Sequence, residues 1–217
     1  MEVLAFVTQK GGTGKSSLAV SLAVAAEQAG RRTALIDIDP QGTTTAWAQR
    51  RQAESPLVET IAWSYLNTRL YRLAQKGIEL AIIDTPGADG TAASAAMQEA
   101  GLCLIPVRPS VADIEAAKPT IRYLNDRDKP FAFVLNQCPV GGRTSRTTNA
   151  FRALQLISGV CDATLAFRSD HMDAMASGRG VTEHAPSGKA AAEVRALLDW
   201  TLARLRRPET LAAEAAE

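Results

Sequence analysis

The feature that most constrains this chain is a glycine-rich segment near its start, TQKGGTGKSS (8–17). A short apolar run, VLAFVT (3–8), precedes it, and an Ala- and Leu-rich stretch that stops at Gly30 follows it. Glycines let backbone N–H groups approach phosphate oxygens, and the start of a helix adds partial positive charge. A strand, this loop and a helix in that order therefore predict a phosphate-binding site in an α/β fold.

The loop departs from the usual phosphate-loop pattern at its opening. Gly14, Lys15 and Ser16 close it as expected, but Gln9 replaces the opening glycine and Lys10 adds a second lysine. Lys15 is predicted to pair with the β- and γ-phosphates, and the Ser16 hydroxyl to ligate Mg²⁺. The residues predicted to contact the nucleotide here are Gly11, Gly12, Thr13, Gly14, Lys15, Ser16 and Ser17.

Short apolar runs recur along the chain and alternate with helical patterns. The predicted strands lie at 3–8, 33–39, 80–85, 102–107 and 131–136. Nearly continuous apolar strands are covered on both faces, so we expect a doubly wound, mostly parallel sheet with helices on both faces. One helical pattern, 114–128, contains Pro119, which is expected to kink it or mark its start. The longest helix is expected at 187–207, so residues 1–207 form one domain and 208–217 an acidic tail.

Composition narrows the class of protein. The net charge is +1, so binding to nucleic acid or to a membrane would need a local basic patch. Cys103, Cys138 and Cys161 form no CxxC pair, which favours a reducing compartment over a disulfide framework or a metal site. Cys103 reads as a small buried hydrophobe. With no basic leader and no apolar run long enough to span a bilayer, we expect a soluble, cytoplasmic protein.

Acidic residues end two of the apolar strands. The motif LIDIDPQG places Asp37 and Asp39 on one face of a strand end, and LAIIDTPG ends another strand at Asp84. Ligands bind at the carboxyl ends of parallel strands, so these carboxylates suit an Mg²⁺ site and an attacking water. Thr85 and Gly87 begin a loop suited to sensing the γ-phosphate. A solvated strand end with turn chemistry is the alternative for the first motif.

These motifs together resemble the ParA/MinD family of deviant Walker ATPases. The family pattern K-G-G-x-G-K-[ST] matches 10–16, DxDPQG matches 37–42, and IPVRPS (105–110) resembles the family's loop beside the adenine. The likeness extends to about residue 205, and the length is similar to that of the small plasmid-type, ParF-like members. Thr8 replaces the common Asn, and Ser16-Ser17 replaces the common Thr-Thr.

The resemblance implies roles for particular residues. Lys10 would cross a dimer interface to the phosphates bound by the other subunit, so that ATP lies between two protomers. Asp39 would position the hydrolytic water, and Asp37 would support the Mg²⁺ shell. Pro106 would lie beside the adenine. Asn136 would contact the base through its amide, or else cap the next turn; both remain open.

The resemblance also implies partners. Small members bind DNA without sequence preference, which would need basic residues on the second half of the chain. The candidates are Arg143, Arg146, Arg168 and Arg179. A solvated face with balanced charges is the alternative for each. A membrane-binding final helix is the other possibility, with Leu198 and Leu202 on its apolar stripe, but the acidic tail disfavours it.

The resulting expectation is an ATPase that partitions or positions a cargo on the nucleoid, with a ParB-like partner stimulating slow hydrolysis. A plasmid or a chromosome locus is the first candidate for the cargo. The alternatives are a protein cargo, such as chemoreceptor clusters or carboxysomes, or a different role as a MinD-like membrane switch. A metal-cluster ATPase of the same superfamily would need a CxxC pair, which the chain lacks. A small-molecule kinase or ligase is disfavoured by DPQG.

Overall fold

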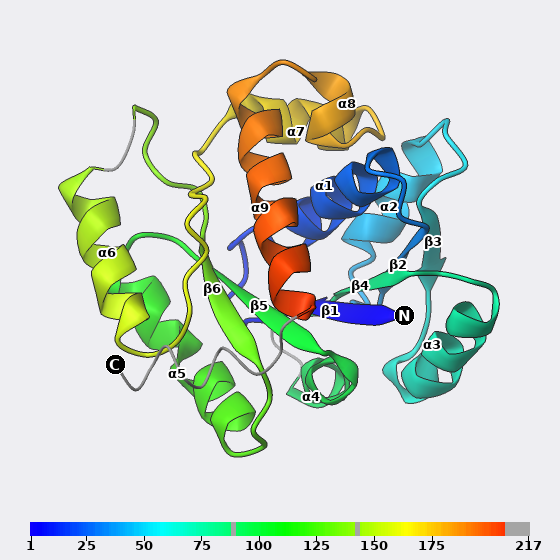
Figure 1. The fold of residues 1–217 in the computed structure, drawn as a ribbon, viewed down its shortest axis with the longest axis horizontal. Helices are drawn as coiled ribbons and strands as arrows, with labels where there is room; N and C mark the ends of the chain where they lie inside the picture. The colour runs from blue at the N-terminus through cyan, green and yellow to red at the C-terminus, as the bar shows by residue number, and fades with distance from the viewer. Residues whose placement is uncertain (88–89, 142–143, 207–217) are drawn as a thin grey trace.

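The computed structural model describes residues 1–87, 90–141 and 144–206. They form a sheet of six parallel strands in the order β3-β2-β4-β1-β5-β6 (Figure 1). The strands are β1 (Glu2–Phe6), β2 (Thr33–Asp37), β3 (Leu57–Thr60), β4 (Leu80–Asp84), β5 (Leu102–Val107) and β6 (Phe131–Leu135). The predicted doubly wound parallel sheet is therefore confirmed.

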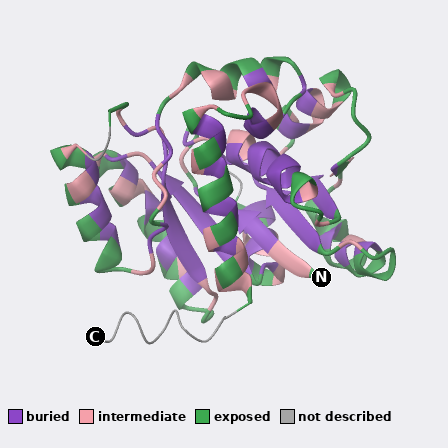
Figure 2. Ribbon diagram, turned by 45° about the horizontal axis from the view of Figure 1, so that its top comes forward, coloured by how far each residue is buried: buried purple, intermediate pink, exposed green. Residues whose placement is uncertain are grey.

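Helices cover both faces of the sheet, because the inner strands are apolar on both sides (Figure 2). One face carries α1 (Lys15–Gln28), α2 (Thr43–Arg50), α7 (Ser169–Ala176), α8 (Val181–His184) and α9 (Lys189–Leu205). The other carries η1 (Trp63–Tyr65), α3 (Leu66–Gln75), α4 (Gly90–Glu99), α5 (Val111–Asn125) and α6 (Ser145–Gln155). Cys103 is fully buried within β5, as predicted, and burial raises the pKa of its thiol to about 12.

Two elements differ from the sequence-based expectation. β3 is an edge strand of four residues with half-exposed and exposed side chains, so it carries no apolar run to predict it. Pro119 does not start a helix: α5 begins at Val111, where the Ser110 hydroxyl accepts a hydrogen bond from the Asp113 N–H. Pro119 lies inside α5. The side-chain cap fixes the start of the helix, since it satisfies an N–H that has no partner within the helix.

A buried tryptophan ties α2 to the segment that joins α7 and α8. Trp47 is fully buried and its indole Nε1–H donates to the Arg179 carbonyl at 3.0 Å. The Arg51 guanidinium lies 5.0 Å from the Trp47 ring and forms an ion pair with Glu183 at 2.8 Å. These contacts fix the helix that begins beside the phosphate-binding loop.

The register of the strands brings the predicted motifs together. Asp84 of β4 pairs with Phe6 of β1 on one side and with Asp37 of β2 on the other. The glycine loop, which follows β1, therefore begins at the same edge of the sheet as both aspartates. This is the carboxyl edge, where α/β folds bind ligands.

Candidate functional site

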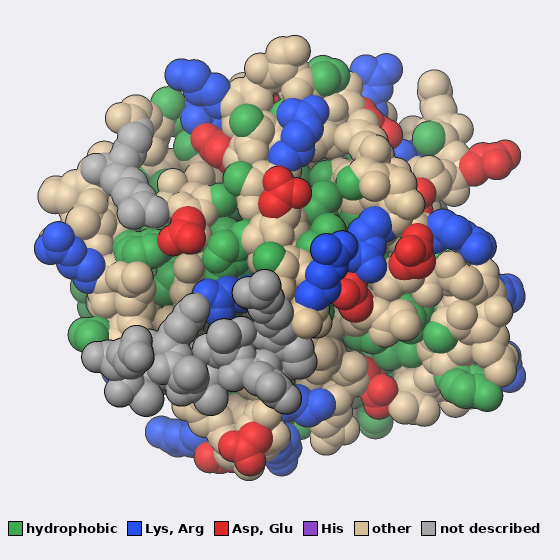
Figure 3. All heavy atoms as spheres, viewed as in Figure 1, with side chains coloured by type: hydrophobic (Ala, Val, Ile, Leu, Met, Phe, Trp, Pro, Cys, Tyr) green, Lys and Arg blue, Asp and Glu red, His purple; other side chains and the backbone are tan. Residues whose placement is uncertain are grey.

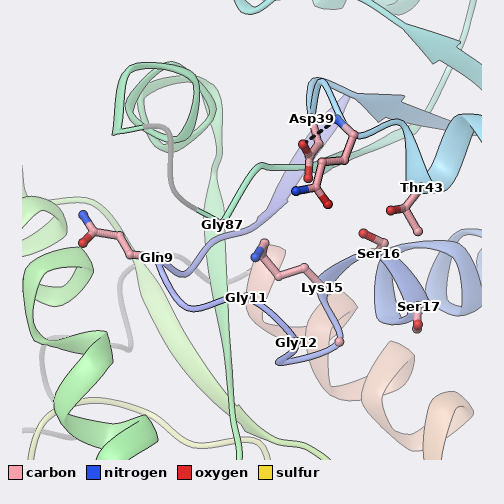
Figure 4. A pocket seen from close by; sticks show the side chains of 11 residues that line it. Gln9, Gly11, Gly12, Lys15, Ser16, Ser17, Asp39, Thr43 and Gly87 are labelled. Atoms are coloured by element: carbon pink, nitrogen blue, oxygen red, sulfur yellow. Dashed lines mark hydrogen bonds between the residues drawn. The ribbon is translucent and has the colours of Figure 1, made fainter.

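A cleft of about 340 Å³ opens above the glycine loop (Figure 4). The residues that line it are Gln9, Gly11, Gly12, Gly14, Lys15, Ser16, Ser17, Asp39, Gln41, Thr43 and Gly87. Most of the predicted phosphate-binding residues are among them. Gln41 and Thr43 were missed by the sequence reasoning, although the DPQG turn and the three threonines after it were a signal for a polar loop beside the site.

The loop owes its shape to glycines and to a brace from β6. Gly12 and Gly14 have φ of 74° and 92°, and Gly14 precedes α1. The Asn136 amide Nδ2 donates to the Thr13 carbonyl at 2.7 Å, and the Gln137 amide Nε2 donates to the Gly12 carbonyl at 3.0 Å. Asn136 therefore holds the phosphate-binding loop in place, a role that the sequence did not suggest.

Lys15 supplies positive charge to the cleft. The residue is 7% exposed, and burial lowers the pKa of its amine, whereas nearby Asp84 and Asp39 act in the opposite direction. In Figure 4 its amine points into the space between Gly87 and Asp39. A Cβ atom on Gly87 would lie 3.6 Å from the Lys15 Nζ, so a glycine leaves this space open. A buried cation whose charge is disfavoured gains most from an anionic ligand.

Asp84 is a buried carboxylate with a free oxygen. Burial raises its pKa to about 6, although Ser16 and Thr44 act to lower it. The Thr44 hydroxyl donates to Oδ2 at 2.7 Å, while the buried Oδ1 has no hydrogen-bond partner. An orphaned buried oxygen beside the Ser16 hydroxyl fits a divalent cation with an oxygen shell. The predicted Mg²⁺ ligands Ser16 and Asp84 therefore lie together.

Both carboxylate oxygens of Asp37, the other predicted Mg²⁺ ligand, accept hydrogen bonds from the protein. The residue is fully buried, its Oδ1 accepts from the Asp39 N–H at 3.0 Å, and its Oδ2 accepts from Thr45. Thr45 donates through both its N–H, at 2.9 Å, and its hydroxyl, at 2.8 Å. Through these hydrogen bonds Asp37 holds the turn and the start of α2, a task that the sequence did not predict. Asp39 lines the cleft, and its Oδ1 accepts from the Gln41 N–H at 2.9 Å.

Several predicted residues do not line the cleft, among them Lys10, Pro106 and Thr85. The Lys10 amine instead lies 3.1 Å from Asp113 of α5. Pro106 is buried within β5, opposite Val134 of β6, so it belongs to the strand rather than to the loop that follows it. The Thr85 hydroxyl instead donates to the Phe6 carbonyl at 2.7 Å. Gly87, two residues further along the same loop, does line the cleft.

A second cavity of about 90 Å³ lies on the other side of the loop. Gly14, Ser17 and Asn136 border it together with exposed Phe167 and Met172. The sequence did not predict this cavity, because the segment that carries Phe167 follows β6 by many residues and reaches the loop only through the fold. Its apolar and amide side chains suit a planar, partly polar ring.

The four candidate arginines have different surroundings. Arg146 and Arg179 are exposed. Arg168 forms an ion pair with Glu193 at 2.6 Å, which balances its charge, and Arg143 lies outside the described residues. On the face seen in Figure 3, basic side chains are dispersed among acidic ones rather than gathered in one patch.

No helix within the described ranges is both long enough and apolar enough to cross a bilayer.

Comparisons with known proteins agree on the kind of domain. The family model described as "CobQ/CobB/MinD/ParA nucleotide binding domain" matches residues 4–181. The maintenance of carboxysome distribution protein A of Gloeobacter kilaueensis is 37% identical over 122 residues, which cover 55% of this chain and 55% of that relative. The chain thus spans about half the length of that curated relative. Protein virC1 of Rhizobium rhizogenes is 30% identical over 166 residues, 71% of this chain and 70% of that protein.

Solved structures share the fold. The MinC:MinD cell division protein complex of Aquifex aeolicus superposes with a TM-score of 0.78 at 16% identity, covering 94% of this chain and 96% of that one. The septum site-determining protein MinD of Pyrococcus horikoshii, complexed with Mg-ADP, gives 0.74 at 17% identity, covering 95% and 98%. The prediction of a nucleotide with Mg²⁺ agrees with the nucleotide-binding family model and with the ligand of this neighbour.

Proposed function

Because this chain belongs to the CobQ/CobB/MinD/ParA family of nucleotide-binding domains, we propose that it is an ATPase that dimerises around ATP. In this proposal the dimer binds nucleoid DNA without sequence preference and positions a cargo. A partner protein of the ParB-like or MinC-like kind stimulates hydrolysis.

The cleft accounts for the nucleotide. Lys15 and the loop N–H groups would hold the phosphates, and the cavity beside Phe167 would take the base in place of the Pro106 loop. Mg²⁺, when bound, would be held by Ser16 and Asp84 and would neutralise phosphate charge. Asp39 is the carboxylate that lines the cleft and is suited to orient the attacking water.

One observation supports the proposal of a dimer. Lys10 belongs to the phosphate-binding loop but does not line the cleft of its own chain. Its side chain is 30% exposed and reaches α5 instead. A lysine on this loop that does not face its own phosphates is available to a second copy bound across the loop. There it would stabilise charge as an arginine finger does, so dimerisation would depend on the γ-phosphate.

Binding to DNA would depend on exposed cations. Arg146 on α6 and Arg179 after α7 are the two candidates that are described and exposed. The net charge is only +1, and on the face seen in Figure 3 basic side chains are dispersed among acidic ones, so binding through that face would rest on separate phosphate contacts rather than on one basic patch. A dimer doubles their number, which makes the affinity depend on ATP and fall steeply with salt.

The cargo has two candidates. The first is a plasmid or chromosome locus. The second is a protein assembly, favoured by the relatives named for maintenance of carboxysome distribution, one of which covers 88% of this chain. A pull-down with the product of a neighbouring gene would separate the two.

The experiment that tests the proposal measures oligomeric state and DNA binding together. Light scattering and anisotropy of a random-sequence duplex would be recorded with ATP, ADP or no nucleotide, at two salt concentrations. We expect an ATP-dependent dimer and salt-sensitive binding, both lost in Lys10→Ala. Lys118→Ala is the matched control, because Lys118 is exposed on α5 and away from the cleft. A monomer that binds ATP but neither dimerises nor binds DNA would refute the proposal.

A further inference from the structure

Exposed aromatic rings gather on η1 and α3, at the end of the sheet that carries β3 (Figure 1). Trp63 is 44% exposed, Tyr65 67% and Tyr71 65%. Single exposed apolar side chains are ordinary on a protein surface, but a group of large ones marks a binding surface. None of the three rings lines the cleft or the cavity beside the glycine loop, so the nucleotide site does not account for them.

Basic side chains share this surface. From 60 to 78 the chain has three basic residues and no acidic one, although the net charge of the whole chain is only +1. Arg72 and Lys76 are exposed, and among the described residues neither of them forms an ion pair. Arg32 is exposed beside them, since its Nη2 donates to the Lys76 carbonyl at 2.9 Å. The surface is therefore a local basic patch, which is what an anionic polymer requires of a nearly neutral protein.

The geometry of α3 brings the rings and the cations to the same side. Leu66, Leu70 and Leu73 are buried in the core, so the opposite side of the helix faces solvent. Residues four apart on a helix are neighbours, so the exposed residues lie in two adjacent rows. One row holds Thr68, Arg72 and Lys76, and the other holds Asn67, Tyr71 and Gln75. Polar side chains thus alternate with the aromatic and basic ones, and the helix has no continuous apolar stripe on this side.

We propose that this surface, the η1–α3 face, binds single-stranded nucleic acid; its residues are Arg32, Trp63, Tyr65, Tyr71, Arg72 and Lys76. The cations would neutralise backbone phosphates, and the rings would stack on bases, which a single strand exposes and a duplex buries. A membrane surface fits less well, because an interfacial helix needs a continuous apolar stripe. Since the face lies outside the nucleotide cleft, this binding does not require ATP. It is therefore separate from the ATP-dependent duplex binding proposed above.

A solvated helix end is the competing explanation. Cations near the last turn of a helix stabilise it through the helix dipole, which accounts for Lys76 and Arg32. The dipole gives no reason for the exposed rings, so Tyr71 decides between the two explanations. Tyr71→Phe keeps the ring, whereas Tyr71→Leu keeps an apolar side chain and removes the ring. Because Tyr71 is exposed, both variants should unfold in urea as wild type does.

The assay is fluorescence anisotropy of a short labelled oligothymidylate, recorded with and without ATP over a series of salt concentrations. We expect the same affinity with and without ATP. Tyr71→Leu should weaken binding about tenfold at every salt concentration, whereas Tyr71→Phe should stay within about twofold of wild type. Arg72→Gln should reduce the slope of log affinity against log salt by about 0.7, which is the contribution of one phosphate contact to a single strand.

Two variants at other exposed positions are matched controls. Arg122→Gln on α5 makes the same charge change as Arg72→Gln, and Leu156→Ala after α6 removes another exposed apolar side chain. Both should bind the oligonucleotide as wild type does.

Two results would overturn the proposal. The first is a wild-type protein that does not bind the oligonucleotide, or a Tyr71→Leu variant that binds it as tightly as wild type does. The second is binding to vesicles of phosphatidylserine and phosphatidylcholine in place of the oligonucleotide, which would assign the face to a membrane surface. Neither result bears on the ATP-dependent dimer, which is tested separately with a duplex and Lys10→Ala.

Discussion

Two buried aspartates on paired strand ends should respond in opposite ways to the same substitution. Asp84 has an oxygen with no partner, and its pKa is raised to about 6. Asp37 has three hydrogen-bond donors directed at its two oxygens. We predict that Asp84→Asn stabilises the nucleotide-free protein near neutral pH and that Asp37→Asn destabilises it.

The size of the effect follows from the shifted pKa. The pKa of Asp84 rises from 3.8 to about 6 on folding. At about 1.4 kcal/mol per pH unit, the folded protein therefore loses about 3 kcal/mol of stability when Asp84 is ionised. An asparagine removes this cost but leaves one amide hydrogen without an acceptor, for a net gain of about 2 kcal/mol. For a domain of this size, that raises Tm by about 4–8 °C.

The sign of the pH dependence provides an internal check. Between about pH 4 and pH 6 the unfolded state has lost the Asp84 proton and the folded state keeps it, so wild-type stability falls as pH rises. Above the pKa that Asp84 has in the folded protein, stability falls no further. The advantage of Asp84→Asn should therefore be full at about pH 7.5 and absent at about pH 4. Asp37→Asn should lose about 2 kcal/mol, because a carboxylate oxygen that accepts hydrogen bonds becomes an NH₂ group.

Thermal unfolding with EDTA at the two pH values is the assay, repeated with Mg-ADP. At a hundredfold excess over the dissociation constant, Mg-ADP should stabilise wild type by about 2.7 kcal/mol, and this gain should be lost in Asp84→Asn. A destabilised Asp84→Asn at neutral pH, or the same advantage at both pH values, would refute the reasoning.

Three further predictions concern the same cleft. Gly14→Ala should destabilise the protein by about 1–3 kcal/mol in urea unfolding and weaken ADP binding, since φ is 92° and its Cβ would lie 2.4 Å from the Asn136 amide nitrogen. Thr44→Val removes the 2.7 Å hydrogen bond to Asp84, so the pH midpoint of the wild-type stability loss should move upward, with about 1 kcal/mol lost near neutral pH. Lys15→Met should reduce ADP affinity more than about tenfold by calorimetry without lowering the stability of the nucleotide-free protein, because burial already disfavours the lysine's charge; a fall in stability would contradict this.

The sheet was largely predictable because its inner strands are buried on both faces and therefore read as apolar runs. β3 was not, since an edge strand of four partly exposed residues has no such pattern. The helix start at Val111 was missed because it depends on the Ser110 cap, whereas Pro119 drew attention to a later position. The Ser110 cap decides where this helix starts, because it satisfies a backbone N–H that has no partner within the helix.

The sequence by itself determined the phosphate-binding loop, because a backbone that approaches phosphate needs glycines, a lysine and a hydroxyl at fixed spacing along one segment. It also determined that Asp84 ends a strand beside that loop. The tertiary structure decided how each polar group is used. The Asp37 carboxylate accepts hydrogen bonds from Thr45. The Asn136 amide, at the end of β6, donates a hydrogen bond to the loop, and Lys10 forms an ion pair with Asp113. Asp113 and Asn136 lie about a hundred residues or more along the chain from the loop they contact. Spacing fixes which groups a segment carries, but which buried oxygens remain free depends on the donors that other segments bring to them.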